Sequence, residues 1–330
     1  MIIVALAGSA EAATRPRYGG VLRVEIRESM ESVDPPDSGT GLADLMGGFA
    51  ITRWEAGRRA IYAADNNAPG GRPFVDAVEV QMGRALRDQS IDLEVGKADV
   101  IELGAGESRR GAAGRKMWMS APVRTVALVF GPRVEDARIR EGLALAVDRA
   151  AILNVLLQRQ GEISGALLPQ WISGYAFLFQ PAADLGKART MIAAAPPGAR
   201  SLSLGVEDAS LRAMADRVAL NARDAGLTVT TAPQANPGDV RLVEVEIASS
   251  DPARALAGIA AALGLIAPAR MENAEAVYNA ERAMLEGFRV VPLFHLPDVY
   301  GAGPWVRGGA GISPLGQWKF ENLWLEGDRP

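Results

Sequence analysis

The most regular pattern of apolar and polar positions in the chain lies between residues 125 and 153. It opens with the apolar run Thr125–Phe130, which predicts a buried strand. After a turn at Gly131 and Pro132, apolar side chains recur every three or four residues within Arg138–Leu153, and this spacing predicts an amphipathic helix. Asp136 stands where the N-cap of that helix is expected. The segment therefore predicts a strand followed by a helix that packs on it.

The same alternation of short apolar runs and amphipathic stretches continues along the chain. Ser201–Val206, a helix that ends at Gly226, and Leu227–Thr231 form a predicted strand–helix–strand unit, which implies parallel pairing. Further strands are expected at 21–26, 76–82, 98–103, 240–247 and 290–296, and further helices at 84–95, 184–195, 251–265 and 272–286. Strands that alternate with helices predict an α/β fold.

Composition narrows the range of functions. The chain has 330 residues, of which 48% are hydrophobic, enough for one large domain or two ordinary ones. Its net charge is −4 and it holds no run of lysine and arginine, so we expect no nucleic-acid partner. No apolar stretch reaches the roughly 18 residues that a membrane span needs. The absence of cysteine excludes disulfides, thiol catalysis and a lipid-modified cysteine anchor.

The first residues resemble the back half of a secretory signal peptide. Met1–Ala7 is apolar, and Ala10 and Ala12 are the small residues that a signal peptidase reads. We interpret residues 1–12 as a signal-peptide remnant that is cut near Ala12, with the true start upstream. The alternative is a frayed or buried strand at the N-terminus.

Several motifs, in order along the chain, resemble one protein family. Asp136–Ile152 reads D-A-R-I-R-E-G-L-A-L-A-V-D-R-A-A-I, which is similar to the signature of family 5 solute-binding proteins, the oligopeptide-, dipeptide- and nickel-binding receptors of bacterial ABC importers. Other segments that resemble this family are Gly19–Val24, Ser32–Pro35, Trp54–Arg59, Gly70–Glu79, Leu93–Val100 and Val290–His295. Relatives carry a long segment, which builds an extra small domain, where this chain has only Pro36–Thr52. The chain therefore resembles a short form of the family without that domain.

The resemblance implies a two-lobed fold of the type II periplasmic binding proteins, with mixed sheets, helices on both faces and a cleft between the lobes. Lobe one would hold residues 13–122 and 300–330, and lobe two residues 123–299. The protein would be soluble, periplasmic and monomeric. It would capture a small-molecule ligand, such as a short peptide, and present it to an ABC permease in the inner membrane. No cofactor is expected.

An enzymatic function has little support among the residues. His295 is the single histidine, so a Ser-His-Asp triad would have to use it, and a zinc site with several histidines is impossible. We expect this histidine to be a half-buried structural residue near the hinge between the lobes. The glycine clusters at 104–106 and 308–311 lack the lysine and the strand–helix context of a phosphate-binding loop. We therefore expect a binding protein with no catalytic residue and no metal.

Three candidate ligand-binding residues follow from the family's acidic motif. Peptide-binding relatives carry an aspartate in a W-x-x-D-Y-P-D-P stretch, and it pairs with the ligand's α-ammonium group. The corresponding place here holds Glu246, Ser250 and Asp251, without the tryptophan and the tyrosine. Asp251 before Pro252 is also a good N-cap with proline at the first helical position. Glu246 could equally lie on a solvent-facing side of its strand.

Three aromatic residues complete the candidate site. Trp171 and Tyr175 lie in a loop that approaches the cleft in relatives, and Trp305 lies close to the second crossing between the lobes. Aromatic rings offer a large contact area to peptides, sugars or apolar ligands. The alternatives are packing of the loop for the first two residues and packing between the lobes for Trp305.

Two functions remain open on this reading. The first is an exported solute-binding protein of an ABC importer, in which the ligand bridges the two lobes and favours their closure. The second is a non-transport periplasmic interaction or sensor protein on the same scaffold. In that case the missing domain and the altered acidic motif mark the loss of peptide binding.

Overall fold

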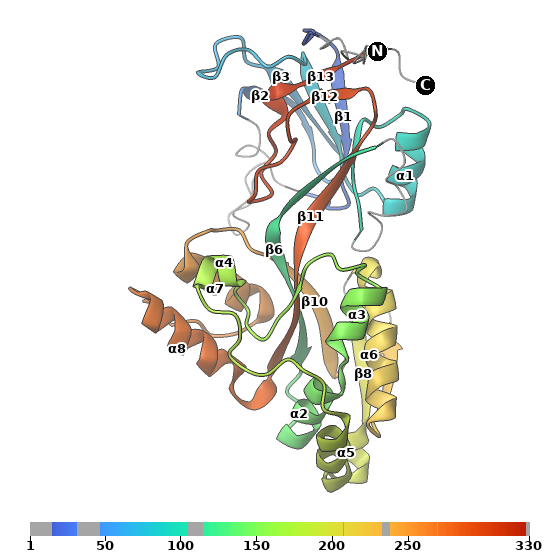
Figure 1. Ribbon diagram of the computed structural model, residues 1–330, viewed down its shortest axis with the longest axis vertical. Coiled ribbons are helices and arrows are strands. Elements are labelled where there is room, and N and C mark those ends of the chain that lie inside the picture. The colour runs from blue at the N-terminus through green and yellow to red at the C-terminus, as the bar shows by residue number, and fades with distance from the viewer. Residues whose placement is uncertain are drawn as a thin grey trace, which may run out of the picture.

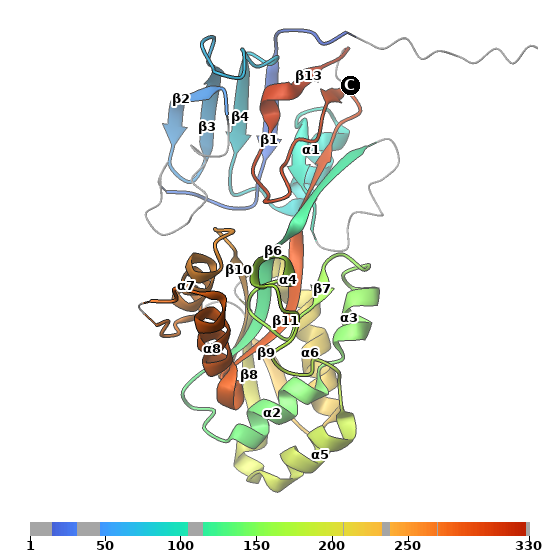
Figure 2. The same cartoon turned by 60° about the vertical axis from the view of Figure 1, so that its left-hand side comes forward.

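The computed structural model describes residues 15–31, 47–104, 115–206, 208–232, 238–268 and 270–327. The proposed signal-peptide remnant and the Ser32–Pro35 motif lie outside the described residues. Within these described ranges, an 11-stranded mixed sheet has the order β2-β3-β4-β1-β5-β11-β6-β10-β8-β9, with β7 paired to β11. Figures 1 and 2 show two bodies stacked along the long axis and joined by β6 and β11.

The first body is built on one end of the sheet. Its elements are β1 (Val21–Glu25), β2 (Phe49–Glu55), β3 (Arg59–Ala64), β4 (Ala77–Gln81), α1 (Leu86–Glu94), β5 (Val100–Glu102), β12 (Val306–Gly308), the turn η4 (Phe320–Asn322) and β13 (Leu323–Leu325). β1 pairs in parallel with β4 and β5, whereas β2, β3 and β4 pair antiparallel. Its hydrophobic core joins residues from Leu22 to Trp118 with residues from Tyr300 to Leu323, so both ends of the chain contribute to it.

The two connecting strands are unusually long. They are β6 (Lys116–Phe130) and β11 (Val290–Ala302), and they pair antiparallel. The strand predicted at residues 125–130 is thus only the last part of β6. Pro122 of β6 lies opposite Pro297 of β11, and the pairing shifts register on both sides of Pro297. Because proline has no N–H to donate and bulges bend a strand, the pair is weakest at the point where it passes from one body to the other.

The second body packs helices on both faces of the other end of the sheet. Its strands are β7 (Glu162–Ile163), β8 (Ser201–Val206), β9 (Thr228–Ala232) and β10 (Val240–Glu246). Its helices are α2 (Ala137–Ala146), α3 (Arg149–Val155), α4 (Gln170–Ser173), α5 (Leu185–Ala194), α6 (Arg212–Asp224), α7 (Pro252–Leu263) and α8 (Ala274–Leu285), with short turns η1 (Pro197–Arg200), η2 (Ala209–Leu211) and η3 (Glu286–Phe288). β8 and β9 pair in parallel around α6, which confirms the predicted strand–helix–strand unit.

The sequence pattern of β6 explains the two helix layers. Successive side chains of a strand point to opposite faces. Val126 and Leu128 therefore belong to the core under α2, α3, α5 and α6, while Ala127 and Val129 belong to the core under α4, α7 and α8. This arrangement confirms the predicted α/β fold with helices on both faces of a mixed sheet.

The prediction of a single helix at residues 138–153 is wrong, because the structure has two helices there, α2 and α3. Asp136 caps α2 as expected, and its side chain accepts a hydrogen bond from the Arg138 amide. Asp148 caps α3 in the same way by accepting from the Ala151 amide at 2.9 Å. A side chain that caps well favours a helix start over a helix interior, so it breaks the helix where the apolar spacing alone predicts continuity.

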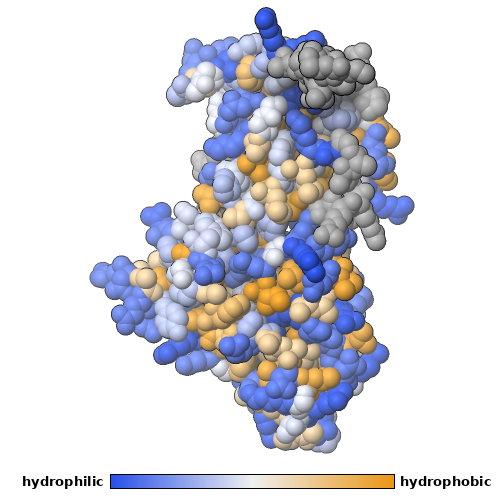
Figure 3. Space-filling model, in the orientation of Figure 1, coloured by the Kyte–Doolittle hydropathy of each residue, from blue (hydrophilic) through white to orange (hydrophobic). Residues whose placement is uncertain are grey.

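None of the helices in the described ranges is long and apolar enough to cross a membrane. On the face shown in Figure 3, hydrophobic residues form separate patches among hydrophilic ones.

Candidate functional site

Adjoining cavities lie where the two bodies meet. The largest has a volume of about 310 Å³ and is lined by Arg27, Glu28, Glu102, Arg124, Asp208, Glu244 and Glu246. Arg27 follows β1 and Glu102 ends β5 in the first body, whereas Asp208 follows β8 and Glu246 ends β10 in the second. The carboxyl ends of strands from both bodies thus face the same space, which is where open α/β sheets usually place their ligands.

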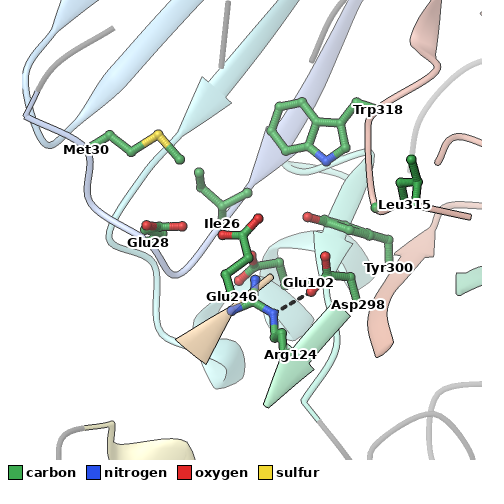
Figure 4. A pocket seen from close by; sticks show the side chains of 11 residues that line it. Ile26, Glu28, Met30, Glu102, Arg124, Glu246, Asp298, Tyr300, Leu315 and Trp318 are labelled. Atoms are coloured by element: carbon green, nitrogen blue, oxygen red, sulfur yellow. Dashed lines mark hydrogen bonds and ion pairs between the residues drawn. The ribbon is translucent and has the colours of Figure 1, made fainter. Parts of the chain in front are cut away.

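A smaller cavity beside it adds an apolar side to this site. It shares Glu28, Glu102, Arg124 and Glu246 with the larger cavity, and it is also lined by Ile26, Met30, Asp298, Tyr300, Leu315, Gly316 and Trp318. Figure 4 shows Trp318, Tyr300 and Leu315 on one side of the carboxylates and Met30 on the other. An apolar wall with a few placed charges is the usual composition of a small-molecule site.

Arg27 connects the two bodies. Its backbone N–H donates to Glu102 Oε2 at 2.7 Å, and its Nε donates to the same oxygen at 3.2 Å. Its Nη1 reaches the second body, where it donates to Asp208 Oδ2 at 2.9 Å and to Ser210 Oγ at 3.1 Å. The Arg27 side chain is largely buried, with an exposed fraction of 25%. It therefore ties the end of β1 to the segment that leads into α6.

Arg124 holds the two crossing strands together beside the cavity. Its Nε donates to Asp298 on β11 at 2.5 Å, and its Nη1 donates to Glu244 on β10 at 3.2 Å (Figure 4 shows the first contact). Burial by itself would lower the pKa of Arg124, but the carboxylates of Asp298 and Glu244 outweigh burial and raise that pKa well above its ordinary value. Arg124 is therefore a fixed positive charge at the floor of the site.

The site as a whole carries an excess of negative charge. Six carboxyl groups, those of Glu28, Glu102, Asp208, Glu244, Glu246 and Asp298, line the two cavities together with the guanidinium groups of Arg27 and Arg124. Burial raises the pKa of Glu102, and the two arginines offset this only in part. A carboxylate excess in a partly buried hollow favours a positively charged guest. Within the described part of the chain, no group of three or more histidines, aspartates and glutamates has the geometry to hold a metal ion.

Of the six residues that the sequence suggested for the site, Glu246 is the one that lines these cavities. Asp251 is exposed and caps α7, because its Oδ1 accepts a hydrogen bond from the Arg254 amide at 2.9 Å, and Ser250 is exposed beside it. The structure thus gives Asp251 the capping role that was the alternative to ligand pairing.

The three aromatic residues lie in three different surroundings. Trp171 of α4 is 40% exposed, and its Nε1 donates to the Pro122 carbonyl at 2.8 Å, next to the crossing strands. Tyr175 donates its hydroxyl to the buried carboxylate of Glu281. Trp305 is 9% exposed within the core of the first body, where its Nε1 donates to Asp99 Oδ1 at 2.7 Å. None of the three is among the residues that line the two cavities.

His295 is more deeply buried than the half-buried position that the sequence led us to expect, since only 2% of it is exposed. Its Nε2 lies 3.1 Å from Ser164 Oγ and its Nδ1 lies 3.2 Å from Glu162 Oε1. Ser164 is also buried, and it donates to the Ala166 carbonyl. A serine without access to a substrate serves structure, so this cluster anchors β7 and its loop to β11.

Comparison with known proteins identifies the family. The sequence model of the bacterial extracellular solute-binding proteins, family 5 (middle region), matches residues 33–251, which is more than half of the chain. The chain belongs to family 5 of the bacterial extracellular solute-binding proteins. Family 5 members are binding proteins rather than enzymes. A search of curated protein sequences gave no significant match.

Solved structures share the fold of this family 5 protein at low sequence identity. The oligopeptide-binding protein AppA of Bacillus subtilis, in complex with a nonapeptide, has 15% identity and a TM-score of 0.64 over 85% of this chain and 66% of its own. NikA of Staphylococcus aureus, in complex with Ni(L-His)2, has 12% identity and a TM-score of 0.69 over 84% of this chain and 68% of its own.

The periplasmic binding protein DppA of Helicobacter pylori, in complex with the peptide STSA, has 14% identity and a TM-score of 0.69 over 85% of this chain and 63% of its own. The chain therefore spans about two thirds of the length of these solved relatives. This share of the relatives' length is consistent with the short form of the family that the sequence resembles.

The sequence analysis did not predict most of the residues that line the site. Arg27, Glu102, Arg124 and Asp298 each stand at or beside a strand. A usable signal was present, since each is a charged residue that interrupts or ends an apolar run, and charged residues are buried only when they are paired.

Proposed function

We propose that this protein is the solute-binding component of an ABC importer, which captures a small solute between its two bodies in the periplasm and presents it to a membrane permease. The observation that carries the proposal is the cavity of about 310 Å³, because its lining comes from both bodies. A guest that contacts both walls binds the closed arrangement better than the open one, and this difference is what drives closure. Membership of family 5 supports the proposal.

We assign the two bodies to two lobes, with residues 13–122 and 300–330 in lobe one and residues 123–299 in lobe two. The separate hydrophobic cores support this division. Pro122 and Pro297 lie opposite each other close to the two points where the chain passes between the lobes, at residues 122–123 and 299–300. Because proline donates no backbone hydrogen bond, the pairing of β6 with β11 is weak there, as a hinge requires.

The charge of the cavity lining suggests the class of solute. An excess of carboxylates favours a small solute with at least one cationic group, such as a short peptide with a free amine or another organic amine. Relatives of known structure include complexes with peptides. Because Asp251 is engaged as a helix cap, we assign the role of pairing with the cation to Glu246, with Glu28 beside it in the same lining.

Thermal-shift measurements followed by calorimetry test this function. The panel holds short lysine-containing peptides, diamines, neutral sugars and dicarboxylates. A cationic member is expected to stabilise the protein, by about 2.7 kcal/mol at a concentration one hundred times its dissociation constant. Glu246→Gln should weaken that binding about tenfold, the usual cost of losing one charge-assisted hydrogen bond. The matched control is Glu272→Gln, at a glutamate that is 76% exposed, and it should leave affinity unchanged.

The results that would contradict the proposal are equally concrete. Preferential binding of dicarboxylates would refute the assignment of a cationic solute. No stabilisation by any member of the panel would count against solute capture, and it would favour the interaction or sensor protein on the same scaffold.

A further inference from the structure

A third cavity lies next to the larger of the two cavities described above, which we call the charged cavity, and it has a different character. Its volume is about 220 Å³. Six aliphatic or thioether side chains dominate its lining: Leu86, Leu156, Leu157, Leu211, Met214 and Leu296. Leu157, Leu211, Met214 and Leu296 are each less than 5% exposed. The cavity therefore has apolar walls that already belong to the packed interior.

Two shared residues join this apolar cavity to the charged one. Arg27 and Glu244 line both of them. The apolar cavity also takes its lining from both lobes, with Leu86 at the start of α1 on one side and Leu211 and Met214 at the start of α6 on the other. A guest that bridges the lobes in the charged cavity is thus within reach of an apolar compartment that the same two lobes enclose.

We infer that the apolar cavity is a subsite for an aliphatic group of the solute, so that the ligand of this protein is an amphipathic organic cation. The inference rests on the proposed function, since it assumes that the charged cavity holds the cationic end. The volume is sufficient, because an apolar cavity of about 150 Å³ in another protein accepts benzene. Burial of hydrocarbon against leucine side chains then adds affinity in proportion to the area removed from water.

A series of linear amines tests the inference, with ethylamine, butylamine and hexylamine as the probes. Each added methylene is expected to tighten binding about fourfold for as long as the chain enters the apolar cavity. Calorimetry on the full-length protein, at fixed pH and ionic strength, measures this slope. The ammonium group is constant along the series, so the slope reports only the apolar part of the site.

Two variants test whether the dependence of affinity on alkyl chain length arises in the apolar cavity. Ala213 of α6 borders the cavity, and the large ring in Ala213→Phe should flatten the slope. Ala193→Phe, at an exposed position on α5 outside the cavity, should keep the full slope. Both positions are exposed alanines in helices, so neither change disturbs the core.

Each outcome decides the question. A slope in the wild type that Ala213→Phe abolishes supports the subsite. Equal affinity for all three amines refutes the subsite and leaves the proposed capture of a cation intact. A slope that survives in Ala213→Phe refutes the location. Failure of every amine to bind refutes both the subsite and the cationic class of the proposed solute.

Discussion

Replacement of Glu281 by alanine should destabilise the protein strongly, although this residue lies outside the candidate site. Glu281 of α8 is fully buried. Its carboxylate accepts hydrogen bonds from the Leu167 amide, from the Leu168 amide at 3.0 Å and from the Tyr175 hydroxyl. One carboxylate thus secures the loop that carries α4 and Trp171 against α8.

The size of the effect follows from the groups left behind. Two buried backbone N–H groups would lose their acceptor, at roughly 1–3 kcal/mol each. Burial of the Glu281 carboxylate is itself unfavourable, since burial raises its pKa despite the three hydrogen-bond donors. Removal of the carboxylate therefore offsets part of the destabilisation. We expect Glu281→Ala to lower the free energy of unfolding by about 3 kcal/mol, at the lower end of the usual cost of breaking a buried charged network.

Urea unfolding at pH 7, followed by tryptophan fluorescence and circular dichroism, measures this loss as a lower midpoint at an unchanged slope. Tyr175→Phe removes one donor only and should cost about 1 kcal/mol. Glu275→Ala, at an exposed position on the same helix, should change the free energy of unfolding by less than about 0.5 kcal/mol. Equal midpoints for Glu281→Ala and Glu275→Ala would refute the anchoring role.

Three further predictions concern stability. In Glu281→Gln the side-chain amide keeps an acceptor for the backbone N–H groups but cannot titrate. Because burial raises the pKa of Glu281 in the folded protein, the free energy of unfolding of the wild type should fall relative to that of this variant as pH rises from about 4.5. Parallel curves of unfolding free energy against pH, measured from pH 4 to 7, would contradict this. Asp251→Ala should cost about 1 kcal/mol through the lost cap of α7 and leave solute affinity unchanged, whereas weaker binding by calorimetry would restore a ligand role to this residue. Gly308→Ala should lower the free energy of unfolding by more than about 1 kcal/mol, because φ is +112° and the new Cβ would lie 2.2 Å from the Asn322 carbonyl oxygen. The control is Gly309→Ala, whose Cβ would meet nothing within 4 Å. Equal melting temperatures for the two variants would contradict the reasoning.

The sequence predicted most of the fold because the elements are locally specified. The apolar run at Thr125–Phe130 and the unit around α6 follow directly from periodicity. The early part of β6 was missed, because Lys116–Ala121 follows a glycine-rich stretch and carries mixed polarity. The division of α2 from α3 was missed as well, because apolar spacing does not reveal that Asp148 caps a second helix.

The candidate site was harder to predict because it is assembled from four strand ends that are distant in sequence. Glu246 was found through a family motif, but its neighbours in the cavity, Arg27, Glu102 and Arg124, come from three other segments. Only the three-dimensional order of the strands brings these charges together. Trp305 illustrates the opposite error, since a tryptophan near a crossing point can pack into a core as well as face a ligand.

The most direct test of solute capture is the distance between the lobes with and without a bound solute. The chain has no cysteine, so spin labels at Ile51→Cys on β2 and Glu275→Cys on α8 report on the two lobes without interference. Figure 2 places β2 and α8 on the same side of the crossing strands. The protein is titrated with the panel member that stabilises it most. We predict that the distance distribution shifts and narrows, and that it saturates at one solute per protein. Saturated binding with an unchanged distribution would contradict a hinged receptor.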